Sequence, residues 1–151
     1  MKKKIVITGG LGYIGTELCK LYSGVSWHHS IKIIDNRFIS ERVNQIRNWN
    51  MEFIQGDILD QELIKKHCSD ADIVHHLAGV TQVPRTKNES SAEQDAKIKE
   101  VGEKGTQNIL DVIDEKCKII FPSTHVVYEG IGEVKTDIKE NEATKPVLSY
   151  S

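Results

Sequence analysis

Three glycines at equal spacing follow the first apolar segment of the chain. Gly9, Gly12 and Gly15 stand three residues apart in the stretch KIVITGGLGYIG, which begins at Lys4. In a phosphate-binding turn the first glycine permits a sharp turn, the second lets backbone approach a pyrophosphate, and the third lets a helix pack tightly. Free N–H groups at the start of that helix would hold the phosphates. The glycines alone are also compatible with a plain tight turn.

An acidic residue stands where a dinucleotide site needs one. Asp35 ends the apolar stretch IKIID, about twenty residues after the glycines, which is the usual place for a partner of the adenosine ribose. Its carboxylate can accept hydrogen bonds from ribose hydroxyls and would repel a 2′-phosphate, so NAD is favoured over NADP. Arg37 is near enough to blur this preference. A helix N-cap is the alternative role for Asp35.

Length and composition indicate one soluble domain with a substantial core. The chain has 151 residues, of which 38% are hydrophobic, and 20 basic against 22 acidic residues give a net charge of −2. This balance excludes the strongly basic surface of a nucleic-acid-binding protein. No apolar stretch approaches the ~20 residues that span a bilayer, and the short apolar run after Met1–Lys4 predicts no secretory signal.

Neither cysteine nor histidine spacing predicts a metal site. The three cysteines are far apart, which predicts buried reduced thiols in a cytoplasmic protein; they are Cys19, Cys68 and Cys117. The adjacent His28 and His29 have no third ligand nearby, so a solvated loop is the favoured interpretation. His75 and His76 must point to opposite faces of a strand, which favours neutral core histidines over catalytic ones.

Apolar segments alternate with helical patterns along the chain. The predicted strands are Ile5–Ile7, Ile31–Asp35, Met51–Gln55, Asp72–Ala78 and Lys118–Phe121. The predicted helices run from the glycine turn to about Gly24, over Ser40–Trp49, from the capping residue Asp60 to about Cys68, and through a long region that includes Ile98–Ile113. Strands separated by helices predict a doubly wound parallel sheet with right-handed crossovers and strand order 3-2-1-4-5.

Two glycines and two polar stretches interrupt this pattern. Gly102 and Gly105 lie within the last helical region, where each costs about 1 kcal/mol relative to alanine, so a bend or a close neighbour is expected there. Thr81–Ser91 is predicted to be a polar loop. Gly130–Lys145 is predicted to be a charged loop that adds nothing to the core.

Taken together, seven motifs resemble one enzyme family. They are TGGLGYIG at 8–15, IIDN at 33–36, GDILD at 56–60, HLAG at 76–79, GTQNIL at 105–110, FPSTHVVYEG at 121–130 and PVLSY at 146–150. Their order and spacing resemble an extended short-chain dehydrogenase/reductase, and most closely the NAD-dependent nucleotide-sugar epimerase/dehydratase family. The resemblance implies a Rossmann NAD-binding domain over residues 1–151, with a nucleotide sugar as substrate; a homodimer stays open.

The resemblance implies a role for each matching residue. The glycine turn would hold the pyrophosphate, Asp35 the ribose, and Asp57 with Ile58 the adenine. Leu77, Ala78 and Gly79 would line the path to the nicotinamide. The full implied cofactor set is Gly9, Gly12, Tyr13, Ile14, Gly15, Asp35, Asn36, Asp57, Ile58, Leu77, Ala78 and Gly79.

Two further positions match the family's catalytic residues. Thr124 matches the Ser/Thr that hydrogen-bonds the reacting oxygen, and Tyr150, four residues after Pro146, matches the tyrosine whose phenolate takes the hydroxyl proton. The alternatives are a cap for Thr124 and an ordinary aromatic residue for Tyr150.

The chain also departs from the family pattern. Gly102 and Glu103 replace the usual Asn-Val, and Glu129 replaces a glycine. The Asp-Glu pair that serves dehydration is replaced by His125 and Val126. Because valine cannot move a proton, epimerisation or simple oxidoreduction is favoured over dehydration.

The family's catalytic lysine would fall four residues after Tyr150, beyond Ser151. We therefore expect the NAD-binding portion of an enzyme truncated before its later strands and substrate domain, and inactive alone. Two other hypotheses stay open: a non-catalytic NAD-binding or regulatory module, and a cofactor-free interaction domain. The last predicts no NAD in the purified protein.

Overall fold

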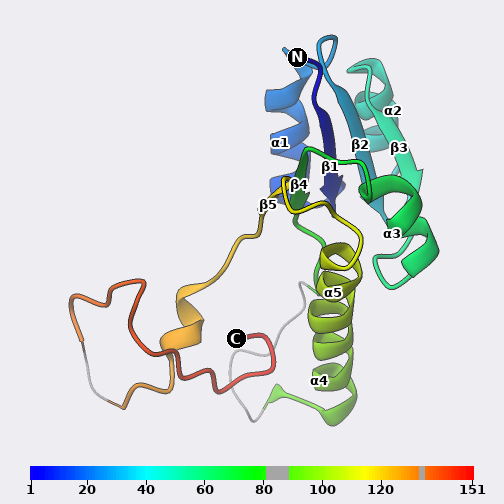
Figure 1. The fold of residues 1–151 in the computed structure, drawn as a ribbon. Coiled ribbons are helices and arrows are strands. Elements are labelled where there is room, and N and C mark those ends of the chain that lie inside the picture. The colour runs from blue at the N-terminus through cyan, green and yellow to red at the C-terminus, as the bar shows by residue number, and fades with distance from the viewer. Residues whose placement is uncertain (81–88, 133–134) are drawn as a thin grey trace.

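One parallel sheet forms the centre of the molecule. The computed structural model describes residues 1–80, 89–132 and 135–151. Its sheet has the order β3-β2-β1-β4-β5, which confirms the predicted doubly wound Rossmann topology (Figure 1). The strands are β1 (Lys4–Thr8), β2 (Ser30–Asp35), β3 (Glu52–Gln55), β4 (Ile73–His76) and β5 (Lys118–Ile120). The helices are α1 (Tyr13–Ser23), α2 (Ser40–Asn48), α3 (Gln61–Cys68), α4 (Ala92–Lys99), the π-helix η2 (Glu100–Lys104), α5 (Gly105–Leu110) and the 3-10 helix η3 (His125–Tyr128).

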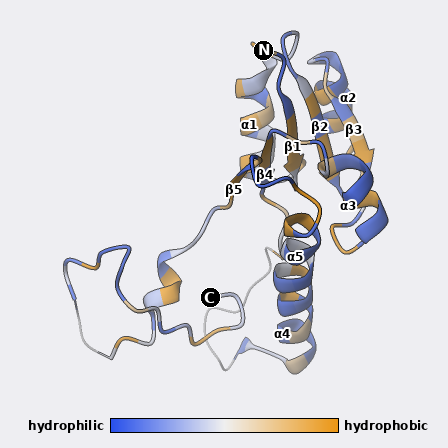
Figure 2. Ribbon diagram, in the orientation of Figure 1, coloured by the Kyte–Doolittle hydropathy of each residue, from blue (hydrophilic) through white to orange (hydrophobic). Residues whose placement is uncertain are grey.

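Alternating side chains of the central strand enter two separate cores. Ile5 and Ile7 of β1 pack in a cluster with residues of α1 and α2. Val6, between them, packs in a second cluster with residues of α3 and α5. Both sheet faces are therefore covered, which explains the continuous apolar runs in the strands. The ribbon coloured by hydropathy shows the same pattern, with apolar strands between helices of mixed character (Figure 2).

Side chains at helix starts satisfy free backbone N–H groups. Asp60 accepts a hydrogen bond from the N–H of Leu63 at 3.0 Å, which confirms its predicted capping role. Ser91 accepts from the N–H of Gln94 at 3.2 Å. Gly12, the residue before α1, makes no side-chain cap.

The two glycines in the last helical region have different surroundings. Gly105 is buried, and a Cβ there would stand 2.7 Å from Cγ1 of Ile58, so the predicted close neighbour is confirmed at this position. A Cβ on Gly102 would have nothing within 4 Å. There the helix widens into η2 instead. π-Helical turns of this kind often occur near functional sites.

The third, fourth and fifth strands are shorter than predicted. The fourth strand was expected over Asp72–Ala78, but β4 ends at His76 because the N–H groups of Leu77 and Ala78 turn to the carbonyl and hydroxyl of Thr8, at 3.1 and 3.3 Å. β5 ends at Ile120 rather than Phe121, and β3 begins one residue after Met51. The predicted loop at Thr81–Ser91 lies mostly outside the described residues.

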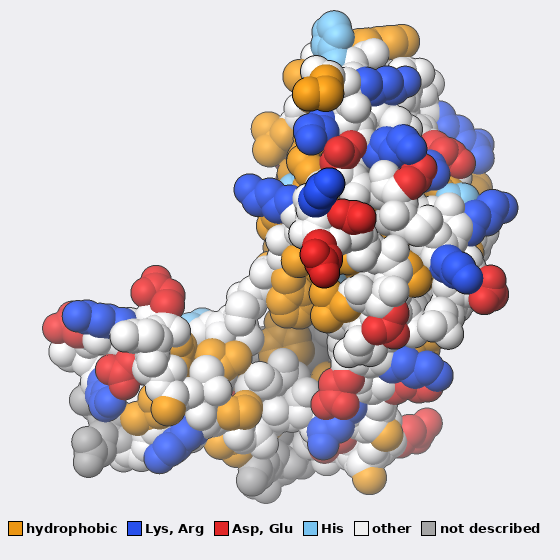
Figure 3. Space-filling view, viewed as in Figure 1, with side chains coloured by type: hydrophobic (Ala, Val, Ile, Leu, Met, Phe, Trp, Pro, Cys, Tyr) orange, Lys and Arg blue, Asp and Glu red, His pale blue; other side chains and the backbone are white. Residues whose placement is uncertain are grey.

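The chain beyond the sheet is organised differently. Residues 121–151, which we call the C-terminal segment, extend away from the sheet in Figure 1, and none of their described residues is buried. The predicted charged loop is irregular throughout its described residues. Figure 3 shows hydrophobic side chains gathered where this segment leaves the sheet, and Phe121 there is 57% exposed.

The cysteines are free thiols in the described part of the chain. Cys19 and Cys68 are buried and Cys117 is partly exposed. Burial raises the pKa of the Cys19 and Cys68 thiols to about 12, so both are inert at neutral pH.

Candidate functional site

A large cleft opens at the carboxyl ends of the central strands. It has a volume of about 1070 Å³ and is lined by the glycine turn, the ends of β2, β3 and β4, and one face of α4 and η2. Its position coincides with the point where the chain crosses from one side of β1 to the other. Open parallel sheets bind their ligands at such points.

Gly9 fixes the shape of the turn at one end of the cleft. Its φ is +69°, a left-handed conformation that favours glycine. Its N–H donates to the carbonyl of Ile34 at 2.7 Å. A Cβ on Gly9 would stand 2.7 Å from backbone atoms of Leu77 and Ala78. A side chain at this position would therefore push two walls of the cleft apart.

Gly12 and Gly15 set the start of α1 against that turn. Gly15 is buried, and a Cβ on it would stand 2.6 Å from Cα of Gly10, so the third glycine packs on the turn itself. Thr16 donates its side-chain hydroxyl and its N–H to the carbonyl of Gly12, at 2.7 and 2.9 Å. The helix N-terminus thus stands at the cleft with its positive dipole end available to an anion.

Asp35 is buried at the end of β2, and both of its carboxylate oxygens accept hydrogen bonds. Its Oδ2 accepts from the N–H of Leu11 at 2.9 Å. Its carboxylate also accepts from the backbone N–H, Nε and Nη2 of Arg37 at 3.0, 3.1 and 3.3 Å. These bonds to Asp35 raise the pKa of the Arg37 guanidinium. The alternative role, an N-cap for Asp35, is not seen in the structure: Ile39 precedes α2.

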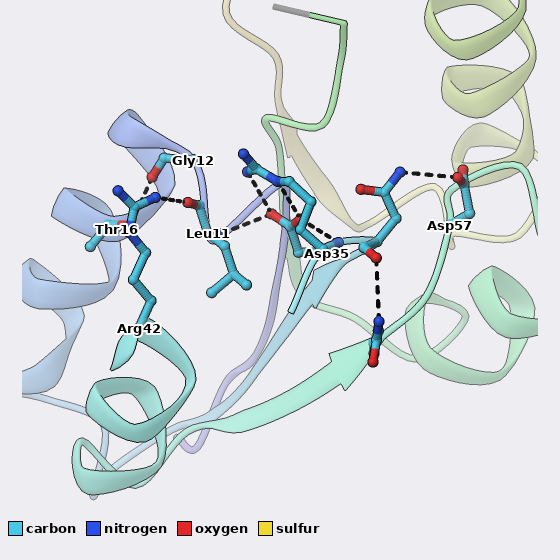
Figure 4. Close-up of polar contacts among 9 residues, drawn as sticks. Leu11, Gly12, Thr16, Asp35, Arg42 and Asp57 are labelled. Atoms are coloured by element: carbon cyan, nitrogen blue, oxygen red, sulfur yellow. Dashed lines mark hydrogen bonds and ion pairs between the residues drawn. The ribbon is translucent and has the colours of Figure 1, made fainter. Parts of the chain in front are cut away.

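A second arginine reaches the glycine turn from α2. Arg42 donates a hydrogen bond from its guanidinium to the carbonyl of Leu11, and Figure 4 shows it beside Leu11, Gly12 and Thr16. Two guanidinium groups and one carboxylate therefore surround this corner of the cleft. Arg37 was expected near this corner from the sequence, whereas Arg42 was not.

The opposite corner is built from the loop after β3. Asp57 accepts from the side-chain amide of Asn36 at 3.1 Å and from the N–H of Leu59 at 3.0 Å. Ile58 is buried, and its carbonyl accepts from the side-chain amide of Asn108 at 2.9 Å. The helix that carries Asn108 thereby fixes the loop that contributes Asp57 and Ile58 to the cleft.

The buried His76, at the end of β4, contacts both β1 and α5. His76 Nδ1 lies 2.8 Å from the hydroxyl of Thr8, and Nε2 lies 3.0 Å from the hydroxyl of Thr106. Burial lowers its pKa to about 4, so the ring is neutral. His75 contacts the hydroxyl of Tyr22 at 2.8 Å, and burial lowers its pKa too. The prediction of neutral core histidines on opposite faces is confirmed.

Most of the predicted cofactor residues share the cleft. Ten line it: Gly9, Gly12, Tyr13, Asp35, Asn36, Asp57, Ile58, Leu77, Ala78 and Gly79. Ile14 is 60% exposed outside it, and Gly15 lies beneath the turn. The wall formed by α4 and η2 and several positions beside the predicted residues were not expected from the sequence. These further lining residues are Ile34, Arg42, Gly56, Leu59, Val80, Glu93, Ala96, Lys97, Glu100 and Val101.

The two predicted catalytic residues do not line the cleft. Thr124 precedes η3, and its hydroxyl accepts from the N–H of Val126 at 3.3 Å, which matches its alternative role as a cap. Tyr150 is 45% exposed near the end of the chain. Their catalytic roles therefore stay predictions.

Glu129 connects the surroundings of these two residues. Its Oε1 accepts from the N–H groups of Val147 and Leu148 at 2.9 and 2.7 Å, and from the hydroxyl of Ser151 at 2.9 Å. The unusual glutamate thus holds the stretch that carries Tyr150 against the end of η3.

Two other kinds of site find no support. In the ranges that the structure describes, no three histidine, cysteine or acidic side chains are grouped to hold a metal ion. No helix among the same residues is long and apolar enough to cross a membrane.

Known proteins are similar to this chain in sequence. The profile of the 3-beta hydroxysteroid dehydrogenase/isomerase family matches residues 6–149. The UDP-N-acetyl-alpha-D-glucosaminuronate decarboxylase of Bacillus cytotoxicus is 33% identical over 130 residues, covering 85% of this chain and 38% of that protein. The UDP-glucose 4-epimerase of Neisseria meningitidis serogroup C is 31% identical over 160 residues, covering 95% of this chain and 44% of that protein.

Solved structures agree on the fold. The Bordetella bronchiseptica enzyme WbmG, in complex with NAD and UDP, superposes with a TM-score of 0.77 at 21% identity, over 99% of this chain and 46% of that one. UDP-glucose 4-epimerase from Bifidobacterium longum, in complex with NAD⁺ and UDP, superposes with a TM-score of 0.75 at 22% identity. The match covers 97% of this chain and 44% of that one.

The sheet order and the cleft at its carboxyl edge define a Rossmann-type fold. The chain belongs to the 3-beta hydroxysteroid dehydrogenase/isomerase family. Its relatives include epimerases and dehydratases of nucleotide sugars, so the predicted relationship is confirmed. The chain spans less than half the length of the relatives named above.

Proposed function

We propose that this chain is the NAD-binding part of a nucleotide-sugar epimerase-like oxidoreductase, which transfers a hydride between a sugar hydroxyl and NAD. The observation that carries the proposal is the cleft of about 1070 Å³. In it a glycine turn, a helix N-terminus and the Asp35 carboxylate meet at the carboxyl ends of parallel strands. These groups match the pyrophosphate and ribose of a dinucleotide. The NAD in the two solved neighbours supports the proposal.

Each wall of the cleft has a task under this proposal. The N-terminus of α1 holds the pyrophosphate, Asp35 the adenosine ribose, and Asp57 with Ile58 the adenine. The stretch 77–79 guides the nicotinamide end. NAD bound there supplies the hydride acceptor. Residues 1–151 act as one NAD-binding domain.

The proton-transfer roles are assigned to the C-terminal segment. Thr124 hydrogen-bonds the reacting sugar oxygen, and Tyr150 removes the hydroxyl proton. Neither residue lines the cleft, so these two roles rest on the resemblance of the motifs that carry Thr124 and Tyr150. Epimerisation or oxidoreduction is preferred to dehydration, since Val126 cannot transfer a proton.

The proposal also covers the substrate, the cellular location and the partners of the protein. The substrate is a nucleotide sugar, by analogy with the UDP in the solved neighbours. We place the protein in the cytoplasm and propose a homodimer as its assembly. A net charge of −2 argues against a nucleic-acid partner.

A calorimetric titration with NADH tests the proposal. The wild-type chain should bind, and Asp35→Ala should weaken binding about tenfold, as expected for the loss of charge-assisted hydrogen bonds. Asp70→Asn is the matched control, because Asp70 forms an exposed ion pair with Lys4 away from the cleft lining. Absence of NADH binding, or equal affinity in the wild type and Asp35→Ala, would contradict the proposal.

A further inference from the structure

The two residues with predicted proton-transfer roles lie in separate stretches of the C-terminal segment. Thr124 precedes η3, and Tyr150 lies in the stretch 145–151. Both stretches lie beyond the sheet in Figure 1, and no described residue of either is buried. Because buried packing does not fix them, their arrangement depends on hydrogen bonds within the segment.

Backbone hydrogen bonds join the two stretches at Lys145. Its N–H donates to the carbonyl of Val127 at 2.8 Å, and its carbonyl accepts from the N–H of Gly130 at 2.9 Å. A Cβ on Gly130 would stand 2.5 Å from the carbonyl oxygen of Lys145, so this close approach depends on glycine. The next residue, Pro146, has no N–H that could continue the pairing.

The side chain of Glu129 binds the residues that follow Pro146. Its Oε1 accepts from the N–H groups of Val147 and Leu148 at 2.9 and 2.7 Å, and from the hydroxyl of Ser151 at 2.9 Å. Successive backbone N–H groups that converge on one anion are a recurring anion-binding arrangement. Hydrogen bonds to a charged acceptor are about twice as strong as neutral ones, so one carboxylate can hold an exposed stretch.

These bonds hold both ends of the turn that carries Tyr150. The N–H of Ser151 donates to the carbonyl of Leu148 at 3.1 Å, which closes a β-turn over residues 148–151 with Tyr150 as its third residue. Glu129 binds the first residue of this turn through its N–H and the last through its hydroxyl. The position of the turn therefore depends on where Glu129 itself is held.

Glu129 is held by η3, the short helix that Thr124 caps. The N–H of Glu129 donates to the carbonyl of Val126 at 3.0 Å. The N–H of Val126 in turn donates to the hydroxyl of Thr124 at 3.3 Å. A continuous series of hydrogen bonds therefore connects Thr124 with the turn that carries Tyr150.

We propose that Glu129 is a positioning residue, whose carboxylate holds the turn at residues 148–151 against η3 and thereby sets Tyr150 relative to Thr124. The proposal rests on the proposed function, which gives Thr124 and Tyr150 their proton-transfer roles. It goes further because Glu129 stands where the family pattern has a glycine, and a glycine has no side chain to make these bonds.

Two substitutions of Glu129, made in a form of the protein as long as its relatives, test this role. Glu129→Ala removes the acceptor, whereas Glu129→Gln keeps an acceptor oxygen at the same reach without the charge. Glu142→Ala is the matched control, because Glu142 pairs with Lys135 at 3.0 Å on the same segment. Glu129→Ala is also combined with Tyr150→Phe. For each protein, kcat and KM are measured with UDP-glucose, and the dissociation constant is measured with NADH.

We expect Glu129→Ala to lower kcat about tenfold. This is less than the ~10²-fold loss that a misplacement of about 1 Å can cause, because the broken bonds are exposed to water. The KM and the NADH dissociation constant should change by less than about twofold, since Glu129 does not line the cleft. Glu129→Gln should recover most of the lost kcat, and Glu142→Ala should match the wild type.

The double variant shows whether Glu129 acts through Tyr150. Residues that act as a unit have non-additive effects on catalysis. Glu129→Ala should therefore cause no further loss of kcat when Tyr150→Phe is already present. An equal loss with and without the Tyr150 hydroxyl would overturn the proposal.

Amide exchange of the whole chain, followed by NMR, tests the contact itself. The amides of Val147 and Leu148 should exchange faster in Glu129→Ala than in Glu129→Gln. Faster exchange in Glu129→Ala with an unchanged kcat would make Glu129 a structural residue only, and the proposal would be overturned.

Failure of the proposed function gives a different result. If Tyr150→Phe is as active as the wild type, the proton-transfer role of Tyr150 is wrong, and the role of Glu129 is overturned with it. If Tyr150→Phe is inactive and Glu129→Ala keeps the wild-type kcat, the role of Tyr150 stands and that of Glu129 alone is overturned.

Discussion

The sheet-bearing body, residues 1–120, and the C-terminal segment, residues 121–151, are held in place by different means. The body has five hydrogen-bonded strands between two apolar cores. No described residue of the segment is buried. Buried packing fixes side chains within narrow limits, and exposed loops lack that constraint. The cleft is therefore preassembled, whereas the predicted proton-transfer residues are not positioned by the sheet.

The polar side chains of the two regions also differ in burial. Asp35 and His76 are buried with several hydrogen-bond partners, so their orientation is fixed before any ligand arrives. Tyr150 is exposed, and Thr124 uses its hydroxyl to cap η3. Binding and catalysis should therefore respond differently to mutation in the two regions.

The largest effect is expected from the segment, and on chemistry alone. In a form of the protein as long as its relatives, Tyr150→Phe should slow hydride transfer by about three orders of magnitude, since the phenolate of Tyr150 is the proton acceptor. Thr124→Val should lower kcat about 10²-fold, and Thr124→Ser should change little. NADH affinity should be unchanged in all three. The absorbance of reduced nicotinamide measures the rate. A Tyr150→Phe enzyme that reduced bound NAD at nearly the normal rate would show that Tyr150 is not the base.

Alanine substitutions at two glycines test how closely the body is packed. Gly15→Ala should lower the free energy of unfolding by about 3 kcal/mol, the upper range for overpacking, because the new methyl group meets backbone atoms of the glycine turn. Gly102→Ala is the control, since its Cβ would point into open space. It should raise the free energy of unfolding by about 0.5–1 kcal/mol. Urea unfolding measures both. Equal stability of the two variants would mean that the turn is not closely packed.

The buried histidines make the stability of the body depend on pH. The pKa of His76 is lowered from 6.5 to about 4 in the folded chain, so the unfolded chain binds more protons between these values. The stabilisation is therefore complete above pH 6.5 and decreases as the pH falls toward 4. We expect a loss of about 2 kcal/mol between pH 7 and pH 5.

Two variants give the comparison for this pH effect. His76→Phe should lose most of the pH dependence. His125→Gln, on the exposed segment, should keep it. Urea unfolding at the two pH values measures the difference, and a wild-type stability that did not change between them would contradict the neutral, buried His76.

The smallest effect is expected within the segment. Glu129→Ala should speed hydrogen exchange of the Val147 and Leu148 amides by about fivefold, because the bonds it breaks are exposed to solvent. Glu142→Ala is the matched control: Glu142 pairs with Lys135 at 3.0 Å on the same segment. Amide exchange followed by NMR distinguishes them. Equal exchange rates in both variants would mean that Glu129 does not hold the stretch that carries Tyr150.

The sequence predicted features that depend on local patterns. The strand order followed from the alternation of apolar segments and helices. Gly9 and Asp35 could be predicted because a turn and a strand end require these residue types at these places. The neutral histidines could be predicted because neighbours on one strand must face opposite sides.

Features that depend on how elements dock could not be predicted. Arg42 contacts Leu11 only because α2 packs beside the glycine turn. The α4 wall contains Glu93, Lys97 and Glu100. Their helical spacing gives a polar face, which on sequence alone is the same as a face exposed to solvent. The position of Thr124 outside the cleft depends on the path of the chain after β5, where no apolar pattern fixes the backbone.

Hydrogen exchange of the whole chain with and without NADH tests most directly whether the cofactor site belongs to the body. Peptides that contain the glycine turn, residues 35–37, 57–59 and 77–79 should become protected when NADH binds. Peptides within residues 121–151 should exchange at the same rate in both states. Equal protection of the C-terminal segment, or none at the glycine turn, would contradict a cofactor site preassembled by the sheet.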